Sequence, residues 1–192
     1  KKLSKKNNIH LCVLTDGASA QYKDKKMILE RKNACKKSGK ILGISNYTFL
    51  DFPDMKLDSV PHLEINRELE KIIKKINPKI VYTTSRCDIN KDHQKVFEST
   101  LVATRPQSSN VKKVFSYETD GITIRRFSPN VFEDISKEFE YKIKSFRMYK
   151  SEIRAFPHPR SLKAIENLAI RRGVESGTTK AEAFELIRFI NQ

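Results

Sequence analysis

Apolar residues recur along this chain in two patterns, short β-rich runs and longer stretches with an apolar residue every three or four positions. The short runs predict strands, and the longer stretches predict amphipathic helices. The predicted strands are 9–14, 47–52, 79–84, 111–118 and 122–127. The predicted helices are 23–40, 63–76, 92–105, a long helix that begins at Ser136, 160–172 and 180–190. Strands that alternate with helices are typical of α/β proteins, in which helices cover both faces of a mostly parallel sheet.

Glycine and proline mark the ends of several of these elements. Gly17 follows the first predicted strand, and Gly43 and Gly173 follow predicted helices. Asn77-Pro78 ends another helix, because the residue before a proline disfavours helical backbone angles. The chain shows no repeat, linker or low-complexity tract, so we predict a single domain over residues 1–192.

The amino end of the chain has the composition of a helix tail. It begins at Lys1 rather than at a methionine, and the basic segment Lys1–Lys6 leads almost directly into the first predicted strand. We therefore expect that an upstream segment is missing, and that it holds part of any active site.

The strongest candidate for chemistry is Asp88-Ile89-Asn90-Lys91-Asp92-His93, which follows the predicted strand 79–84. Ligands of open α/β sheets bind beyond the carboxyl ends of the strands. A neutral imidazole at that place is a natural metal ligand, and the preceding Asp92 can orient it or its neighbours. A lone His at a helix start is more often a surface or capping residue, and zinc catalysis needs about three protein ligands. His93 would therefore need partners from elsewhere.

Other candidates have an equally plain structural explanation. His158 stands between two prolines and beside Arg160, an arrangement that either aims both side chains into a pocket or makes a stiff surface connection. Arg31 either extends along the surface or binds a carboxylate or phosphate. Asp16 ends the first predicted strand and belongs either to a ligand loop or to a simple turn. These residues together favour a metal-dependent α/β hydrolase.

Composition narrows the class of protein. Hydrophobic residues make up 38% and charged residues 32% of the 192 positions, as in a soluble globular protein. No apolar run approaches the roughly 20 residues that span a bilayer, so we expect no transmembrane segment. The three cysteines form an odd count without paired spacing, which favours reduced thiols in a cytoplasm over a disulfide framework.

The net charge of +15 indicates either an anionic partner or a lysine-rich, solvated surface. The lysines are spread along the sequence and are not interleaved with aromatic residues. This distribution favours a solvated surface, and we predict that the protein does not bind nucleic acid. A basic nucleic-acid-binding α/β domain is the weaker alternative, since it would leave the Asp-His loop unexplained.

Several sequence pieces, in order along nearly the whole chain, together resemble a known family. The main pieces are Val13-Leu14-Thr15-Asp16-Gly17, Arg31 with Ile41-Leu42-Gly43-Ile44, Phe49-Leu50-Asp51-Phe52-Pro53-Asp54, Asp88-Ile89-Asn90-Lys91-Asp92-His93, Phe127-Ser128-Pro129-Asn130, Pro157-His158-Pro159-Arg160-Ser161 and Ala181-Glu182-Ala183-Phe184-Glu185. In these pieces the chain resembles the PIG-L/LmbE-like family of zinc-dependent de-N-acetylases, which includes the N-acetylglucosaminyl-phosphatidylinositol deacetylase.

The resemblance implies a Rossmann-like α/β fold and metal-assisted removal of an acetyl group from an N-acetylated sugar, with Zn²⁺ or another divalent metal as cofactor. It implies that His93 is the downstream metal ligand, and we assign Asp92 a catalytic role. Because Asn90 stands where several members have a His, we take His158 as a candidate substitute acid. The remaining assignments, as substrate-binding residues, are Arg31, Asp16, Asn130 and Arg160.

The family's His-Pro-Asp-Asp-Glu motif does not occur in this sequence. The resemblance therefore implies that the first strand, two metal ligands and the general base are missing, and that the chain alone is inactive. The alternative is a catalytically dead domain that binds a glycan or a protein partner. We expect a cytoplasmic protein, and its assembly into a homo-oligomer is left open.

Overall fold

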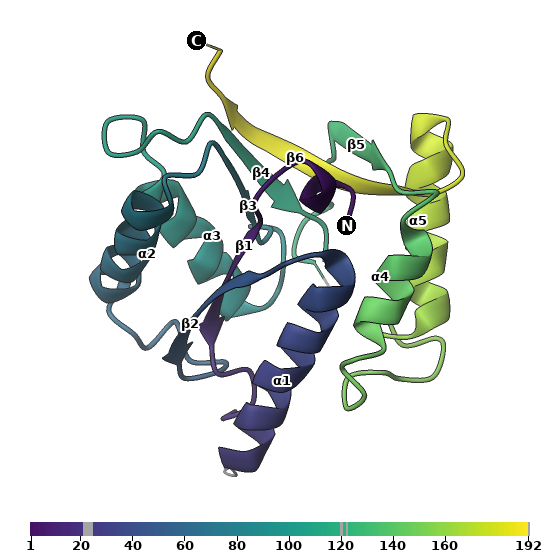
Figure 1. The fold of residues 1–192 in the computed structure, drawn as a ribbon, viewed down its shortest axis with the longest axis horizontal. Coiled ribbons are helices and arrows are strands. Elements are labelled where there is room, and N and C mark those ends of the chain that lie inside the picture. The colour runs from purple at the N-terminus through teal and green to yellow at the C-terminus, as the bar shows by residue number, and fades with distance from the viewer. Residues whose placement is uncertain (21–24, 120, 122, 192) are drawn as a thin grey trace. The chain divides into compact units, whose positions relative to one another are not determined.

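The computed structural model describes residues 1–20, 25–119, 121 and 123–191 of this α/β protein (Figure 1). The chain forms two compact units, each built from two separate stretches of sequence. The first unit comprises Lys1–Asp54 and Glu133–Glu182, and the second comprises Met55–Phe132 and Ala183–Gln192. The prediction of a single domain over 1–192 stays a prediction.

The first unit is built around a parallel strand pair. Its elements are η1 (Leu3–Lys5), β1 (His10–Thr15), α1 (Lys25–Leu42), β2 (Asn46–Phe52), α4 (Phe139–Phe146) and α5 (Leu162–Ser176). Strands β1 and β2 run parallel, with His10 opposite Asn46, and α1 connects them. Helices α4 and α5 enclose a small apolar core that includes Phe139, Ile143 and Ile165.

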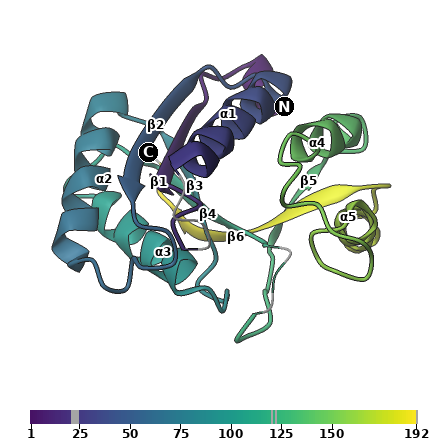
Figure 2. The same cartoon turned by 90° about the horizontal axis from the view of Figure 1, so that it is seen from below.

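The second unit contains the other sheet. Its elements are α2 (His62–Ile76), β3 (Ile80–Thr83), α3 (Lys91–Ala103), β4 (Lys113–Tyr117) and most of β6 (Ala181–Phe189), and β5 (Val131–Asp134) crosses the unit boundary. The strand order is β3-β4-β6-β5, with β3 and β4 parallel and β4 and β6 antiparallel. Helices α2 and α3 pack together beside this sheet (Figure 2).

The predicted fold class is confirmed, because helices flank sheets that hold two parallel strand pairs. The first four predicted strands correspond to β1, β2, β3 and β4. Helix α1 ends where expected, at Gly43 with a φ of +86°. Residues 23 and 24 of the predicted first helix lie outside the described residues, as does residue 122 of the predicted strand 122–127. In that strand, Thr123 forms only an isolated bridge to Asp88.

The helix predicted over 180–190 is wrong, because this segment is strand β6. Its composition of Ala, Glu and Leu favours a helix locally. Burial nevertheless alternates with a period of two, so that Ala181, Ala183 and Glu185 are buried and their neighbours less so. Antiparallel pairing with β4 therefore overrides local propensity.

Two helix boundaries also differ from the prediction. Helix α5 does not end at Gly173 but continues to Ser176, and Gly177 ends it with a φ of +69°. Gly173 lies inside the helix. A Cβ at this position would lie 2.7 Å from the Thr178 carbonyl oxygen, which explains why a glycine stands there. The helix predicted from Ser136 begins at Phe139 and is only eight residues long. No helix in the described part of the chain is both long and apolar enough to cross a bilayer.

Candidate functional site

The loop between β3 and α3 places His93 in the first turn of a helix. Asn90 is the N-cap of α3, and its side-chain oxygen accepts the Asp92 N–H at 2.8 Å. This cap satisfies one of the free N–H groups at the helix start. It also fixes where the chain enters α3, so the orientation of His93 follows from the Asn-x-Asp-His spacing.

A buried carboxylate holds the imidazole of His93. Asp88 is 3% exposed, and its Oδ2 lies 2.7 Å from His93 Nδ1. Thr119 donates its hydroxyl to the same oxygen at 2.6 Å, and the Asn90 N–H donates to Oδ1 at 2.8 Å. Burial opposes ionisation of Asp88, but the hydrogen bonds from Thr119 and His93 outweigh it and lower the pKa of this carboxyl. An ionised Asp88 keeps the proton on Nδ1.

The same contact leaves the other imidazole nitrogen available. With Nδ1–H donated to Asp88, Nε2 carries the lone pair that a metal or a proton would use. The His93 side chain is 37% exposed, so a ligand can reach it. Thr84 donates its hydroxyl to the His93 carbonyl at 2.7 Å and fixes the backbone as well. Asp88 and His93 thus have the arrangement of a metal ligand with its orienting carboxylate.

Asp92 points to a different part of the second unit. Its Oδ2 accepts the Met55 N–H at 2.7 Å, and its Oδ1 accepts the Leu57 N–H at 2.9 Å. The side chain is buried, so both oxygens are engaged in holding the loop ahead of α2. This geometry gives Asp92 a structural role, and the catalytic role assigned from the sequence stays a prediction.

The residues present do not make a zinc site by themselves. A zinc site takes about three protein ligands. In residues 1–20, 25–119, 121 and 123–191, no group of three His, Cys, Asp or Glu side chains is close enough to hold a metal. His93 therefore fits the role of one ligand only, and any metal centre would need further ligands.

In the first unit, two of the predicted substrate-binding residues meet on one carboxylate. Arg31 donates to Oε1 of Glu152, and Arg160 donates to Oε2. Two guanidinium groups and one carboxylate leave one net positive charge, which suits an anionic or hydroxyl-rich ligand. The Arg31 Nε is buried and has no hydrogen-bond partner among the described residues. No site role was predicted for Glu152, and its contact with both guanidinium groups becomes visible only in the fold.

The third predicted residue of this region, His158, has a local structural role. Its Nδ1 accepts the Arg160 N–H at 3.0 Å, and its backbone N–H donates to the Ala155 carbonyl at 3.0 Å. These bonds build the tight turn that carries Arg160 to Glu152. The acid role of His158 is untested and stays a prediction.

Asp16 forms the turn that follows β1. Its Oδ1 accepts the N–H groups of Ala18 at 3.0 Å and Ser19 at 2.9 Å. Burial opposes ionisation, but these backbone hydrogen bonds lower the pKa of the carboxyl. Ser19 in turn accepts the Asp54 N–H at 3.0 Å, which ties the loops after β1 and β2 together. Asp16 thus lies at the carboxyl edge of the sheet, as predicted, and its substrate contact stays a prediction.

Asn130, the last predicted substrate-binding residue, is bound to strand β6. Its side-chain oxygen accepts the Leu186 N–H at 2.8 Å, and its own N–H donates to the Phe184 carbonyl at 3.0 Å. Both bonds extend the sheet at its β6 side. A role of Asn130 in substrate binding stays a prediction.

Sequence reasoning missed two residues near Asp88. Thr119 follows β4, whose carboxyl end shares an edge with that of β3, so its position after a predicted strand was the available signal. Tyr117 is 38% exposed as a whole, but burial of its phenol group, followed by the negative charge of Asp88, raises its pKa to about 12. Thr119 thus extends the polar network around His93, and Tyr117 lies close enough for the charge of Asp88 to affect it.

Comparisons with known proteins identify the family of this chain. Residues 1–104 match the PIG-L family, described as GlcNAc-PI de-N-acetylase. Over 133 residues the chain is 32% identical to the uncharacterized deacetylase YaiS of Escherichia coli strain K12. The aligned region covers 65% of this chain and 67% of that protein.

Solved structures share the fold at lower identity. N,N'-diacetylchitobiose deacetylase from Pyrococcus horikoshii has a TM-score of 0.79 at 20% identity, over 97% of this chain and 76% of that chain. The 4-carboxy-2-hydroxymuconate hydratase GalB from Pseudomonas putida KT2440 has a TM-score of 0.74 at 17% identity, over 95% of this chain and 85% of that chain. The fold thus carries more than one chemistry, and the family match over more than half of the sequence decides the assignment: this chain belongs to the PIG-L family of GlcNAc-PI de-N-acetylases.

Proposed function

We propose that this chain is part of a metal-dependent hydrolase that removes the acetyl group from an N-acetylated sugar of the N-acetylglucosamine type. The observation that carries the proposal is the Asp88–His93 pair, in which a buried carboxylate orients an exposed imidazole at the carboxyl edge of a parallel strand pair. Family membership and a relative described as a deacetylase support the reaction class. Zn²⁺ is the proposed metal, and another divalent ion would suit the same nitrogen.

The described residues account for part of this function only. His93 supplies one ligand nitrogen, Asp88 keeps its proton on the opposite nitrogen, and Thr119 steadies Asp88. In the first unit, Arg31 and Arg160 offer guanidinium groups that suit sugar hydroxyls or an anionic substituent. The further metal ligands and the base are proposed to come from a His-Pro-Asp-Asp-Glu segment that these 192 residues do not contain.

A second candidate function follows from the same ligand count. With one candidate ligand among the described residues, the chain also suits a catalytically inactive family member that binds a glycan or a protein. Cytoplasmic location and the absence of a nucleic-acid partner stay predictions under either function, and assembly into a homo-oligomer stays open.

Metal content and acetate release distinguish the two functions. We would measure both on this chain and on a version extended by any coding sequence that precedes Lys1, with an N-acetylated chitobiose as substrate. The deacetylase function predicts near-stoichiometric zinc and acetate release in the extended protein, both lost in His93→Ala. His62→Ala is the matched control, because His62 also begins a helix but its Nε2 has no hydrogen-bond partner among the described residues.

The outcomes separate clearly. Zinc that His93→Ala retains as well as His62→Ala does would remove His93 from the metal site. An extended protein without zinc or acetate release would leave the inactive binding domain as the better account.

A further inference from the structure

Helix α1 is rich in positive charge, and two of its lysines, Lys32 and Lys36, lie beside Phe49 of β2. Its 18 residues include seven basic side chains and a single acidic one. Lys32 is paired with Asp51 at 2.6 Å. Lys36 and Lys40 lie one turn apart, both are exposed, and neither has a carboxylate within ion-pair distance among the described residues. Like charges at this spacing repel each other, so a bound anion would relieve a local cost.

These two lysines line a hollow in the surface. The hollow has a volume of about 620 Å³, and its walls are Lys36, Lys40, Ile44, Ser45, Tyr47 and Phe49. Ile44 and Ser45 precede β2, so the hollow lies at the amino ends of the parallel strands β1 and β2. Asp16 and Asp54 follow the opposite, carboxyl ends of these strands. The hollow is therefore separate from the carboxyl edge of this strand pair, where Asp16 lies.

An aromatic floor is built into this hollow. The rings of Tyr47 and Phe49 are nearly parallel, with an interplanar angle of 7° and centroids 6.2 Å apart. The ammonium groups of Lys32 and Lys36 lie 5.6 Å and 5.9 Å from the Phe49 centroid, within the range of a cation–π contact. The floor thus holds cations beside flat apolar surface, which suits a ligand that has both an anionic group and a ring.

Gly39 shows that the position of Tyr47 is structurally specified. A Cβ on Gly39 would lie 2.0 Å from the Tyr47 hydroxyl, so any larger residue there would force this ring to shift. The hydroxyl also donates to the Ile44 carbonyl at 2.8 Å. A helix-interior glycine costs about 1 kcal/mol relative to alanine, so making room for the Tyr47 ring lowers the stability of α1.

We propose that this hollow binds a small phosphate ester whose ring lies on the Tyr47–Phe49 floor, with the phosphoryl group between Lys36 and Lys40. Lysine binds phosphate as a point charge, and two such charges one helical turn apart suit a single phosphoryl group. Sugar phosphates and nucleotides share this chemistry. The lysines near the end of α1 also offset the negative end of the helix dipole, but that effect accounts for neither the hollow nor its aromatic floor.

Binding to this chain can be measured directly, without catalysis. We would titrate it with N-acetylglucosamine 1-phosphate, uridine monophosphate, inorganic phosphate and N-acetylglucosamine at constant ionic strength, and follow backbone amide shifts by NMR. We expect at least one of the two esters to shift residues 36–49 and to bind more tightly than inorganic phosphate, and the neutral sugar not to bind. No shift with either ester, or equal affinity for inorganic phosphate, would overturn the proposal.

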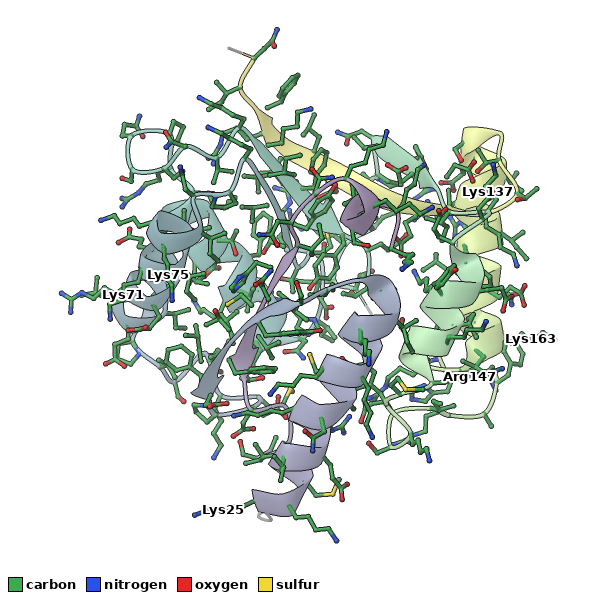
Figure 3. All side chains as sticks on the ribbon, viewed as in Figure 1. Lys25, Lys71, Lys75, Lys137, Arg147 and Lys163 are labelled. Carbon is green, nitrogen blue, oxygen red and sulfur yellow. The ribbon has the colours of Figure 1, made fainter. Side chains whose placement is uncertain are left out.

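A matched pair of double variants tests the role of charge. Lys36→Gln with Lys40→Gln should weaken ester binding about tenfold or more, because two charge-assisted contacts are lost. Lys71→Gln with Lys75→Gln removes the same charge at the same spacing from α2, a helix without Phe, Tyr or Trp in which Lys71 pairs with Glu68, and should leave binding unchanged (Figure 3). Equal weakening in both pairs would show a general effect of net charge and would refute the site.

Phe49→Leu tests the floor separately. This variant keeps an apolar side chain but removes the flat ring, so ester binding should weaken while binding of inorganic phosphate stays the same. An unchanged affinity for the ester would refute the stacking role of Phe49. Circular dichroism on each variant checks that the fold is retained.

Discussion

At the scale of single residues, the position of one carboxylate determines what His93 can do. Asp88 accepts from an imidazole, a hydroxyl and a backbone N–H, and these partners come from the first turn of α3, the segment after β4 and the N-cap of α3. The sequence alone could identify the Asp-x-Asn-x-Asp-His loop. It could not show which aspartate faces the imidazole, because that depends on the cap of α3. The cap turns Asp88 toward His93 and Asp92 toward the backbone of Met55 and Leu57.

Replacing Asp88 should cost stability in a pH-dependent way. Because the folded-state pKa of Asp88 is lowered, its ionised form stabilises the fold above the ordinary aspartate pKa of about 3.9, and this contribution is lost as pH falls through the folded-state value. Asp88→Asn should lower the free energy of unfolding by about 1.5–3 kcal/mol near neutral pH. Urea unfolding of both proteins, from neutral pH down through the aspartate range, should show the difference shrinking. A difference that does not change with pH would contradict this account.

Asp92 should prove important for stability through its two backbone contacts. Asp92→Ala would leave the buried N–H of Leu57 and the N–H of Met55 without acceptors, and we expect a loss of about 2–4 kcal/mol in urea unfolding. If Asp92→Ala leaves stability unchanged, the structural role assigned to Asp92 is wrong.

Met55 has a φ of +57°, which is unfavourable for a residue with a side chain. Met55→Gly should therefore stabilise the protein by roughly 1 kcal/mol in the same urea unfolding experiment.

At the scale of elements, the alternation of strands and helices could be predicted wherever local pattern and tertiary pairing agree. Helix α2 is such a case, with Ile65 and Leu69 buried on one face and the left-handed Asn77 at its end. Strand β6 is the opposite case. Its residues favour a helix, and only the pairing with β4, which is distant in sequence, makes it a strand. The end of α5 was mispredicted because a glycine inside a helix and a glycine after it look the same in sequence.

Alanine substitutions at Gly173, inside α5, and at Gly177, after it, should separate the effect of helix propensity from that of packing. Propensity alone predicts that Gly173→Ala stabilises α5 by about 1 kcal/mol. A Cβ there would lie 2.7 Å from the Thr178 carbonyl oxygen and 2.8 Å from the backbone of Thr179, and backbone cannot move aside easily. We therefore expect a net loss of roughly 1–3 kcal/mol.

Gly177→Ala is the control, because it meets no neighbouring atom and only its φ of +69° is unfavourable. Its loss should be about 1 kcal/mol in the same thermal or urea unfolding experiment. A stabilised Gly173→Ala protein would mean that the loop after α5 yields to the new methyl group.

At the scale of the whole chain, the fold brings together charged and aromatic residues that are separated in the sequence. The lysines are not interleaved with aromatic residues in the sequence, which favours a solvated surface. In the fold, however, α1 and β2 bring Lys32 and Lys36 onto the ring of Phe49. The Arg31–Glu152–Arg160 contact likewise joins residues more than 100 positions apart. Such groupings arise from tertiary structure, so a sequence can supply the residues but cannot show that they meet.

Added salt should stabilise this protein, because two electrostatic effects compete and the repulsive one is larger. The net charge of +15 in 192 residues disfavours the compact state. Opposing it are surface ion pairs such as Lys5–Glu138 and Lys142–Glu182, and exposed pairs contribute only about 0–1 kcal/mol each. Salt screens both effects, so relief of the repulsion should raise the melting temperature between about 20 mM and 300 mM NaCl. In Lys36→Gln with Lys37→Gln, the low-salt melting temperature should be higher and the salt response smaller. A melting temperature that falls with salt would show that the ion pairs outweigh the net charge.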